Sequence, residues 1–221
     1  MLLSEEQVKG LEQPLTKGAI VGNTWPNGIV YYRFFQRRQT GGANFTQTRT
    51  FYDAIAYYHQ HTNLEFRMVT YKNNVISDAT VNEKDYIMLI NGEGSWSYLG
   101  RKGGKQELCL DPSWADVGTA IHELGHAIGL LHEQCRSDRD SYININYANI
   151  QSDKRHNFEI SNQSHQKTAL FDFNSIMLYS SYNSFAIDLN QPTMTRKDGS
   201  GWWAQRSYLS DGDLEAIRMR Y

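Results

Sequence analysis

The stretch that decides the fold is HELGHAIGLLHE, which runs from His122 to Glu133. On a helix, His122 and His126 differ by only about 40° around the axis and by one turn in height, so both imidazoles can reach one metal ion. Glu123 lies about 100° around from His122, where its carboxylate can face the same ion from the side without ligating it, as a general base must. The spacing therefore predicts a metal site on a helix with a base beside it.

The third histidine of the stretch, His132, requires the helix to end. It lies six residues beyond His126, a rise of roughly 9 Å along a continued helix, whereas zinc–nitrogen bonds are about 2.0–2.1 Å long. Gly129 is where the chain reverses most easily, because glycine takes the left-handed conformation after a helix without a Cβ clash. Three histidines leave one zinc position for water, which is typical of a catalytic site. The alternatives are histidines that only pack or face solvent, and a zinc site without catalysis, in which Glu123 would lack a purpose.

The segments around this stretch indicate a chain of mixed α and β structure. Apolar residues at helical spacing predict a helix over about 116–128, with Asp116 as its N-cap, and another over about 46–60. After residue 133 the periodicity is weak and predicts loops and short elements, followed by a capping box at 210–213 and a final helix. Short strands are predicted at five β-rich runs, 29–35, 64–69, 86–90, 95–99 and 107–110.

The composition limits the class of protein. The 221 residues carry 22 basic and 24 acidic side chains, a formal charge of −2, and 40% are apolar, which is an ordinary globular balance. No basic excess supports nucleic-acid binding through bulk charge, and no apolar run approaches the roughly 20 residues of a membrane span. The first residues lack the basic and apolar regions of a signal peptide, so we expect an intracellular protein or one whose export segment has been removed.

Several motifs give the chain a resemblance to one known family. HExxHxxGxxH at 122–132 is the zinc motif of the metzincins, and HEQCRSDRD at 132–140 is close to the HEQSRxDRD of the astacin family of zinc endopeptidases. SIMLY at 175–179 is similar to the family's Met-turn, SxMHY. The stretch 100–108 is similar to its GRxGGxQxL, and 208–213 to its terminal LSxxD. The matches run from about Gly18 to Tyr221, which is nearly the whole chain.

The resemblance implies a role for each matching residue of the zinc motif. One catalytic Zn²⁺ would be bound by His122, His126 and His132. Glu123 would be the general base, which takes a proton from zinc-activated water and delivers it to the leaving amine.

The resemblance also implies roles outside the zinc motif. Tyr179 would be a switching tyrosine that moves to the oxyanion when substrate binds, and Met177 would form a hydrophobic floor beneath the metal. Extended peptides would bind as an added strand along a sheet edge, and the alternative for that segment is an ordinary core strand. The residues implied for this edge are Ser95, Trp96, Ser97 and Tyr98.

The implied fold class is α+β, a two-lobed metzincin-like zinc protease with a cleft that runs past the metal. The N-terminal lobe, about 18–132, would hold a twisted mixed β-sheet and two long helices. The C-terminal lobe, about 133–221, would be mostly irregular, with the Met-turn and a terminal helix. We therefore expect 18–221 to form a secreted, monomeric, zinc-dependent endopeptidase that acts on protein or peptide substrates. The rival classes are a metal-stabilised binding module that has lost hydrolysis and a zinc peptidase whose third ligand is a glutamate.

Family members are made as zymogens, so the start of the chain carries its own prediction. The stretch GAIVG from Gly18 resembles the mature start, which in the family inserts into the C-terminal lobe and reaches the glutamate after the third ligand, here Glu133. Residues 1–17 would then be the remnant of a pro-segment, cut between Lys17 and Gly18 by a trypsin-like activity. The alternative is an inert extension. The family's zinc-blocking FxGD motif does not occur in residues 1–17.

The cysteines depart from the family pattern, because animal members carry two conserved disulfides. Cys109 and Cys135 stand where serine is common in the family, and we expect them to form one disulfide, which would fit a secreted protein. The alternatives are two free thiols, or a contact of Cys135 with zinc. Leu178 replaces the usual histidine of the Met-turn, which removes one polar group beside Tyr179.

Overall fold

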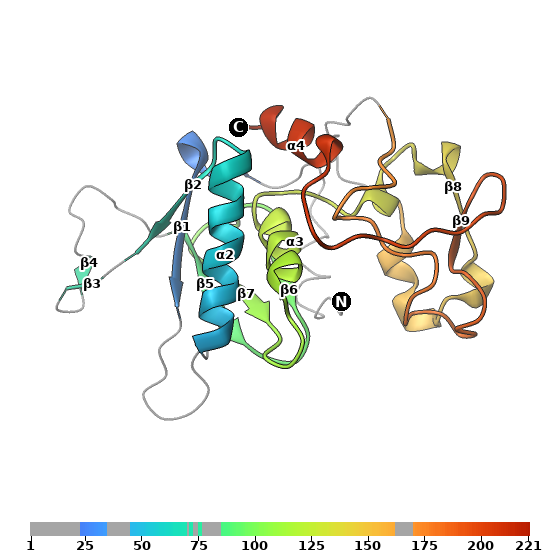
Figure 1. Cartoon of the computed structure of the whole chain (residues 1–221), viewed down its shortest axis with the longest axis horizontal. Helices are drawn as coiled ribbons and strands as arrows, with labels where there is room; N and C mark the ends of the chain where they lie inside the picture. The colour runs from blue at the N-terminus through green and yellow to red at the C-terminus, as the bar shows by residue number, and fades with distance from the viewer. Residues whose placement is uncertain (1–22, 35–44, 70, 73–74, 77–84, 162–169) are drawn as a thin grey trace. The chain divides into compact units, whose positions relative to one another are not determined.

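The computed structural model describes residues 23–34, 45–69, 71–72, 75–76, 85–161 and 170–221. The chain forms two compact units. Within the described residues, the first unit holds 23–130 and 217–221, and the second holds 131–216 (Figure 1). The expected pro-segment 1–17 and the expected cleavage point between Lys17 and Gly18 lie outside the described residues.

The first unit contains a five-stranded mixed sheet in the order β2-β1-β5-β7-β6. Its strands are β1 (Ile29–Phe34), β2 (Glu65–Met68), β5 (Tyr86–Asn91), β6 (Trp96–Ser97) and β7 (Lys105–Leu110). β1 is parallel to β2 and to β5, and β5 is parallel to β7, whereas β6 is antiparallel to β7. In the middle of the sheet, the apolar centre of β5 (87–89) and the apolar second half of β7 (108–110) are buried. A separate antiparallel pair consists of β3 (Tyr71–Lys72) and β4 (Val75–Ile76).

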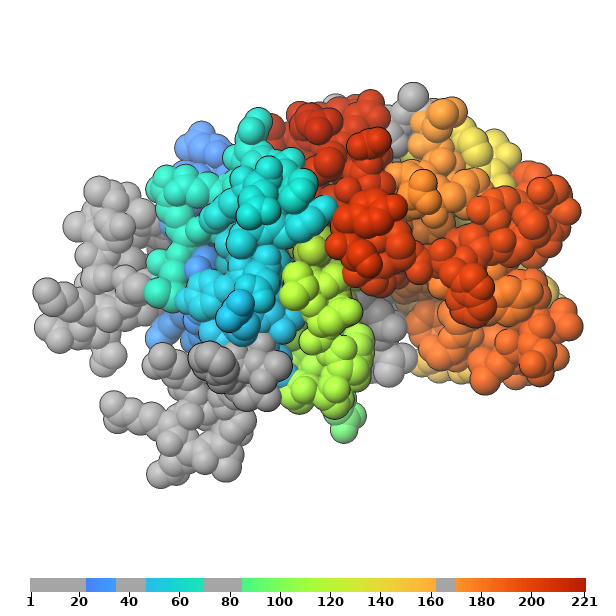
Figure 2. All heavy atoms as spheres, viewed as in Figure 1, coloured from blue at the N-terminus to red at the C-terminus, as the bar shows by residue number. Residues whose placement is uncertain are grey.

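Two helices of the first unit lie side by side in Figures 1 and 2. They are α2 (Phe45–His61) and α3 (Val117–Ala127), and a 3₁₀ turn, η1 (Pro26–Gly28), precedes β1. The Tyr58 hydroxyl of α2 donates a hydrogen bond of 2.9 Å to the carbonyl oxygen of Ile121 in α3. The Asp116 carboxylate accepts a hydrogen bond of 2.8 Å from the backbone N–H of Thr119, which confirms the predicted N-cap. The helices predicted over about 46–60 and about 116–128 are therefore both present.

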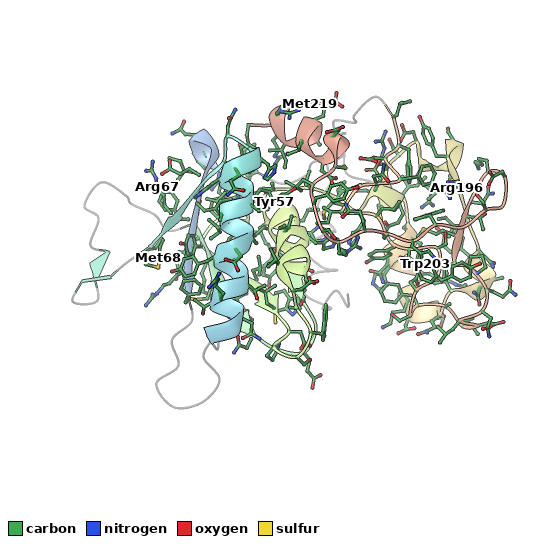
Figure 3. All side chains as sticks on the ribbon, in the orientation of Figure 1. Tyr57, Arg67, Met68, Arg196, Trp203 and Met219 are labelled. Carbon is green, nitrogen blue, oxygen red and sulfur yellow. The ribbon has the colours of Figure 1, made fainter. Side chains whose placement is uncertain are left out.

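The second unit is mostly irregular, and its core joins side chains that are far apart in the sequence. Ile150, Phe158, Leu178 and Met194 are fully buried in this core, each stabilising it by about 1.5–3 kcal/mol. Trp202 is buried there too, whereas Trp203, labelled in Figure 3, is exposed and stacks on Tyr182. The regular elements are β8 (Ile143–Ile145), paired antiparallel with β9 (Met194–Arg196), and the 3₁₀ helices η2 (Glu133–Cys135), η3 (Arg139–Ser141), η4 (Tyr147–Asn149) and η5 (Ser152–Phe158).

The final helix is α4 (Asp211–Arg218), and its start is the predicted capping box. Ser210 Oγ accepts a hydrogen bond of 3.1 Å from the backbone N–H of Asp213, and Asp213 Oδ2 accepts one of 3.0 Å from the backbone N–H of Ser210. The mixed sheet, the helices α2 and α3, the irregular second unit and the terminal helix α4 together confirm the α+β fold class. Among the described residues, no helix has both the length and the apolar character that crossing a membrane requires.

Candidate active site

The helix α3 carries two of the three predicted histidine ligands. The rings of His122 and His126 lie 4.7 Å apart between centroids and are almost perpendicular, at 85°. The possible ligand nitrogens of His122, His126 and His132 all lie within 4.8 Å of one another, and all three side chains are buried. The structure therefore brings together the three imidazoles that the sequence predicts.

The chain reverses at the predicted glycine. Gly129 has a φ of 106°, in the region that favours glycine, directly after the last turn of α3. The backbone N–H of Leu130 donates to the carbonyl oxygen of Gly125 at 2.8 Å, and the N–H of Gly129 donates to that of His126 at 2.8 Å. This is the Schellman pattern, which pairs the last carbonyl groups of a helix while turning the chain away. The turn brings His132 back toward the other two histidines.

The backbone just after the turn fixes the tautomer of His126. Its Nδ1 lies 2.8 Å from the carbonyl oxygen of Leu130, which can only accept, so Nδ1 carries the proton and Nε2 is left for a metal ion. Leu130 was not among the site residues predicted from the sequence. The sequence feature that could have indicated its role is its position four residues after His126, with the chain reversal at Gly129 between them.

The three histidines fit a zinc ion. Imidazole nitrogens are among the ligands that zinc takes in catalytic sites, and nitrogens around a tetrahedral zinc lie about 3.3 Å apart. The ligand atoms lie within 4.8 Å of one another, so the three side chains can serve one ion together. Within the part of the chain that the structure describes, no cysteine or carboxylate joins the group, so Cys135 is not a fourth ligand.

Glu123 is buried on α3, with only 2% of its surface exposed. It follows the first ligand directly, so its carboxylate is held on the same helix as two of the histidines. On the neighbouring strand β7, burial raises the pKa of the Cys109 thiol to about 12, and the negative charges of Asp111 and Glu123 contribute to that rise.

The cysteines correct one prediction, because both are free thiols. Cys109 is fully buried in β7, and its sulfur lies 3.0 Å from the position that a Cβ would take at Gly92. The Cys135 thiol lies 3.5 Å from the carbonyl oxygen of Asn157, and burial raises its pKa to about 12. Each sulfur is thus packed within its own unit, and the expected Cys109–Cys135 disulfide is wrong; the alternative of two free thiols holds.

Glu133 is a buried carboxylate at the start of the second unit. Its Oε1 accepts hydrogen bonds from Arg136 Nη1 at 2.9 Å and from the backbone N–H of Asp172 at 2.8 Å. Burial raises the pKa of Glu133 to about 7, against the lowering effect of those two donors. The mature N-terminus that the resemblance pairs with Glu133 lies outside the described residues.

The Met-turn residues are also buried in the second unit. The backbone N–H of Glu133 donates to the carbonyl oxygen of Met177 at 3.2 Å, which ties the turn to the residue after His132. The Tyr179 ring lies 4.5 Å from the His132 ring, centroid to centroid. Both Met177 and Tyr179 therefore belong to the immediate surroundings of the third histidine.

The predicted substrate edge is shorter than expected. Of the run 95–99, only Trp96–Ser97 is a strand, β6, which lies at the end of the strand order and pairs with β7. Gly94 and Gly100, at φ values of 72° and 65°, end the extended backbone on either side. The side chains of Ser95 and Ser97 are buried, whereas Trp96 and Tyr98 are half-buried, with ring centroids 6.0 Å apart.

Three buried, convergent histidines, with a glutamate directly after the first of them on the same helix, form a site of the kind found in zinc peptidases. A sequence model of the astacin family of peptidases matches residues 19–221. The chain therefore belongs to the astacin family, which confirms the resemblance.

Individual relatives are similar over most of this chain. Flavastacin from Elizabethkingia meningoseptica is 36% identical over 199 residues, which cover 90% of this chain and 42% of that protein. Blastula protease 10 from Paracentrotus lividus is 34% identical over 202 residues, 89% of this chain and 32% of that protein. The chain thus spans less than half the length of these curated relatives. Among solved structures, high choriolytic enzyme 1, a hatching enzyme zinc-protease from Oryzias latipes, superposes with a TM-score of 0.70 at 29% identity, covering 89% of this chain and 91% of that one.

Proposed function

We propose that this protein is a secreted, monomeric zinc endopeptidase that cleaves peptide bonds within extended protein substrates. The observation that carries the proposal is the meeting of His122, His126 and His132 through the reversal at Gly129, with Glu123 on the same helix. Membership in the astacin family supports it. We also propose that 18–221 is the catalytic domain, with lobes of about 18–132 and 133–221.

The chemistry follows from the residues around the histidines. When bound, zinc supplies Lewis-acid chemistry, lowering the pKa of water and polarising a carbonyl group. Glu123 accepts a proton from the attacking water as its oxygen bonds to the carbonyl carbon, and gives that proton to the amine nitrogen as the C–N bond breaks. The Tyr179 hydroxyl donates a hydrogen bond to the developing oxyanion. Met177 would form an apolar floor beneath the metal.

The substrate is proposed to extend the sheet along β6. Backbone groups of Ser95–Tyr98 would pair with the peptide, as in other cases of strand addition. Since the side chains of Ser95 and Ser97 are buried, side-chain contacts with the peptide would fall to Trp96 and Tyr98. Activation would follow cleavage between Lys17 and Gly18, with the new N-terminus reaching Glu133.

The proposal predicts internal cleavage of a denatured protein such as casein once brief trypsin treatment, stopped with a trypsin inhibitor, has activated the chain. We expect new termini inside the substrate, loss of cleavage with EDTA, and recovery when zinc is restored. Mass spectrometry of the products maps the cleavage sites, and N-terminal sequencing identifies the active species. Release of terminal residues only, or cleavage that EDTA does not affect, would contradict the proposal, and an active species that begins at Met1 would contradict its activation step.

A further inference from the structure

Asp213 on α4 is a buried carboxylate that is hydrogen-bonded to the Met-turn, the segment from Ser175 to Tyr179. It is 5% exposed, and its Oδ1 accepts a hydrogen bond of 2.6 Å from Ser175 Oγ. Its Oδ2 accepts from the backbone N–H of Ile176 at 2.9 Å and from that of Ser210 at 3.0 Å. Because the two backbone groups can only donate, an acceptor-only side chain suits this position.

The hydrogen bonds continue from this turn to the third histidine. Ser175 Oγ accepts a hydrogen bond of 3.0 Å from the backbone N–H of Met177. The carbonyl oxygen of Met177 accepts one of 3.2 Å from the backbone N–H of Glu133, the residue that follows His132. Asp213 is therefore linked to the backbone beside a zinc ligand through Ser175 and Met177.

A second connection runs beside the first. Ser210 Oγ donates a hydrogen bond of 2.5 Å to Asp172 Oδ2, and the backbone N–H of Asp172 donates one of 2.8 Å to Glu133 Oε1. Gly212 permits this approach, because a Cβ at that position would lie 2.6 Å from Asp172 Oδ2. Through Ser210 and Asp213, the start of α4 is thus hydrogen-bonded to the segment 172–177, which makes two hydrogen bonds to Glu133.

We propose that Asp213 is a positioning residue, which fixes the Ser175–Tyr179 turn and, through it, the orientation of the zinc ligand His132. The effect that we expect on catalysis rests on the proposed function, whereas the effect on zinc affinity does not depend on it. Burial raises the pKa of Asp213 and the hydrogen bonds from Ser175, Ile176 and Ser210 act against that rise. Mutation of residues that orient a metal ligand, without binding the metal themselves, commonly changes metal affinity 10- to 100-fold.

The test is the Asp213→Asn variant, with Asp211→Asn as the matched control, because Asp211 lies in the same first turn of α4 but is exposed. The new amide cannot keep all three hydrogen bonds as they stand, because its NH₂ group faces either the backbone N–H groups of Ile176 and Ser210 or Ser175 Oγ, which must then change from donor to acceptor. We expect zinc binding about 10- to 100-fold weaker than in the wild type, measured by competition with a chelator. We also expect a lower kcat with little change in KM, while the control behaves as the wild type.

A second variant, Ser175→Ala, breaks the link to Met177 without leaving a changed group at position 213, so it tests the proposal even if Asp213→Asn does not fold. It should weaken zinc binding in the same direction, and the double variant should be little worse than Asp213→Asn alone. Wild-type zinc affinity in the folded variants, with only the melting temperature lowered, would overturn the proposal. A wild type that binds zinc but cleaves nothing would refute the proposed function and leave the zinc measurement valid.

Discussion

The Glu123→Gln variant is expected to lose about 10²- to 10⁴-fold in kcat while it keeps its zinc. Glutamine has almost the same shape as glutamate, so it fills the same buried position on α3, where only 2% of Glu123 is exposed. Its amide cannot accept a proton from water, and the proton transfer that the proposed reaction needs is lost. The measurement is the rate of cleavage of a quenched fluorescent peptide, together with the zinc content of the same sample.

The matched control for this variant is Glu215→Gln, because Glu215 is an exposed glutamate on α4. It should leave both kcat and zinc content unchanged. If Glu123→Gln retains more than a tenth of the wild-type kcat, Glu123 is not the general base. If the wild type itself binds zinc and shows no hydrolysis, the rival interpretation of a metal-stabilised binding module is correct.

The Arg136→Ala variant is expected to destabilise the fold by about 3–5 kcal/mol. The Arg136 side chain is 0% exposed and contacts Glu133 Oε1 at 2.9 Å and Asp138 Oδ1 at 3.0 Å. It also donates to the carbonyl oxygen of Leu170 at 2.8 Å. Removing the guanidinium leaves the Glu133 carboxylate buried without its cation, which costs far more than the loss of an exposed ion pair.

For a chain of this length, the loss in free energy of unfolding corresponds to a fall in melting temperature of roughly 6–20 °C. Urea unfolding in the presence of EDTA measures it without a contribution from bound metal. Arg155→Ala is the control, because Arg155 is exposed and should change stability by less than about 0.5 kcal/mol. A loss below about 1 kcal/mol in Arg136→Ala would show that this buried ion pair does not support the fold.

The candidate site was predictable because its geometry is encoded in one short stretch. The four-residue spacing of His122 and His126 requires a helix, and the distance to His132 requires that the helix end. Gly129 supplies the reversal, and its φ of 106° agrees with that prediction. The helices α2 and α3 were predictable for a related reason, since each has a regular apolar face and α3 has an N-cap at Asp116.

The features that were not predictable depend on contacts between distant parts of the chain. The sequence does not say whether Cys109 and Cys135 meet. The predicted disulfide is wrong because both are free thiols, each packed against residues of its own unit. Asp213 was recognised as part of a capping box, but its hydrogen bond to Ser175 joins residues 38 positions apart. The irregular second unit has little periodicity to interpret, because its core gathers single apolar residues from many short segments.

The central claim is that His122, His126 and His132 bind one zinc ion because the chain reverses between the second and the third. It is tested most directly by measuring the zinc content of dialysed wild type and of His126→Ala by mass spectrometry. We expect about one zinc ion per wild-type chain, the one-ion stoichiometry of a catalytic site, and a near-complete loss in the variant. A wild type that holds no zinc, or a variant that retains the wild-type amount, would contradict the claim.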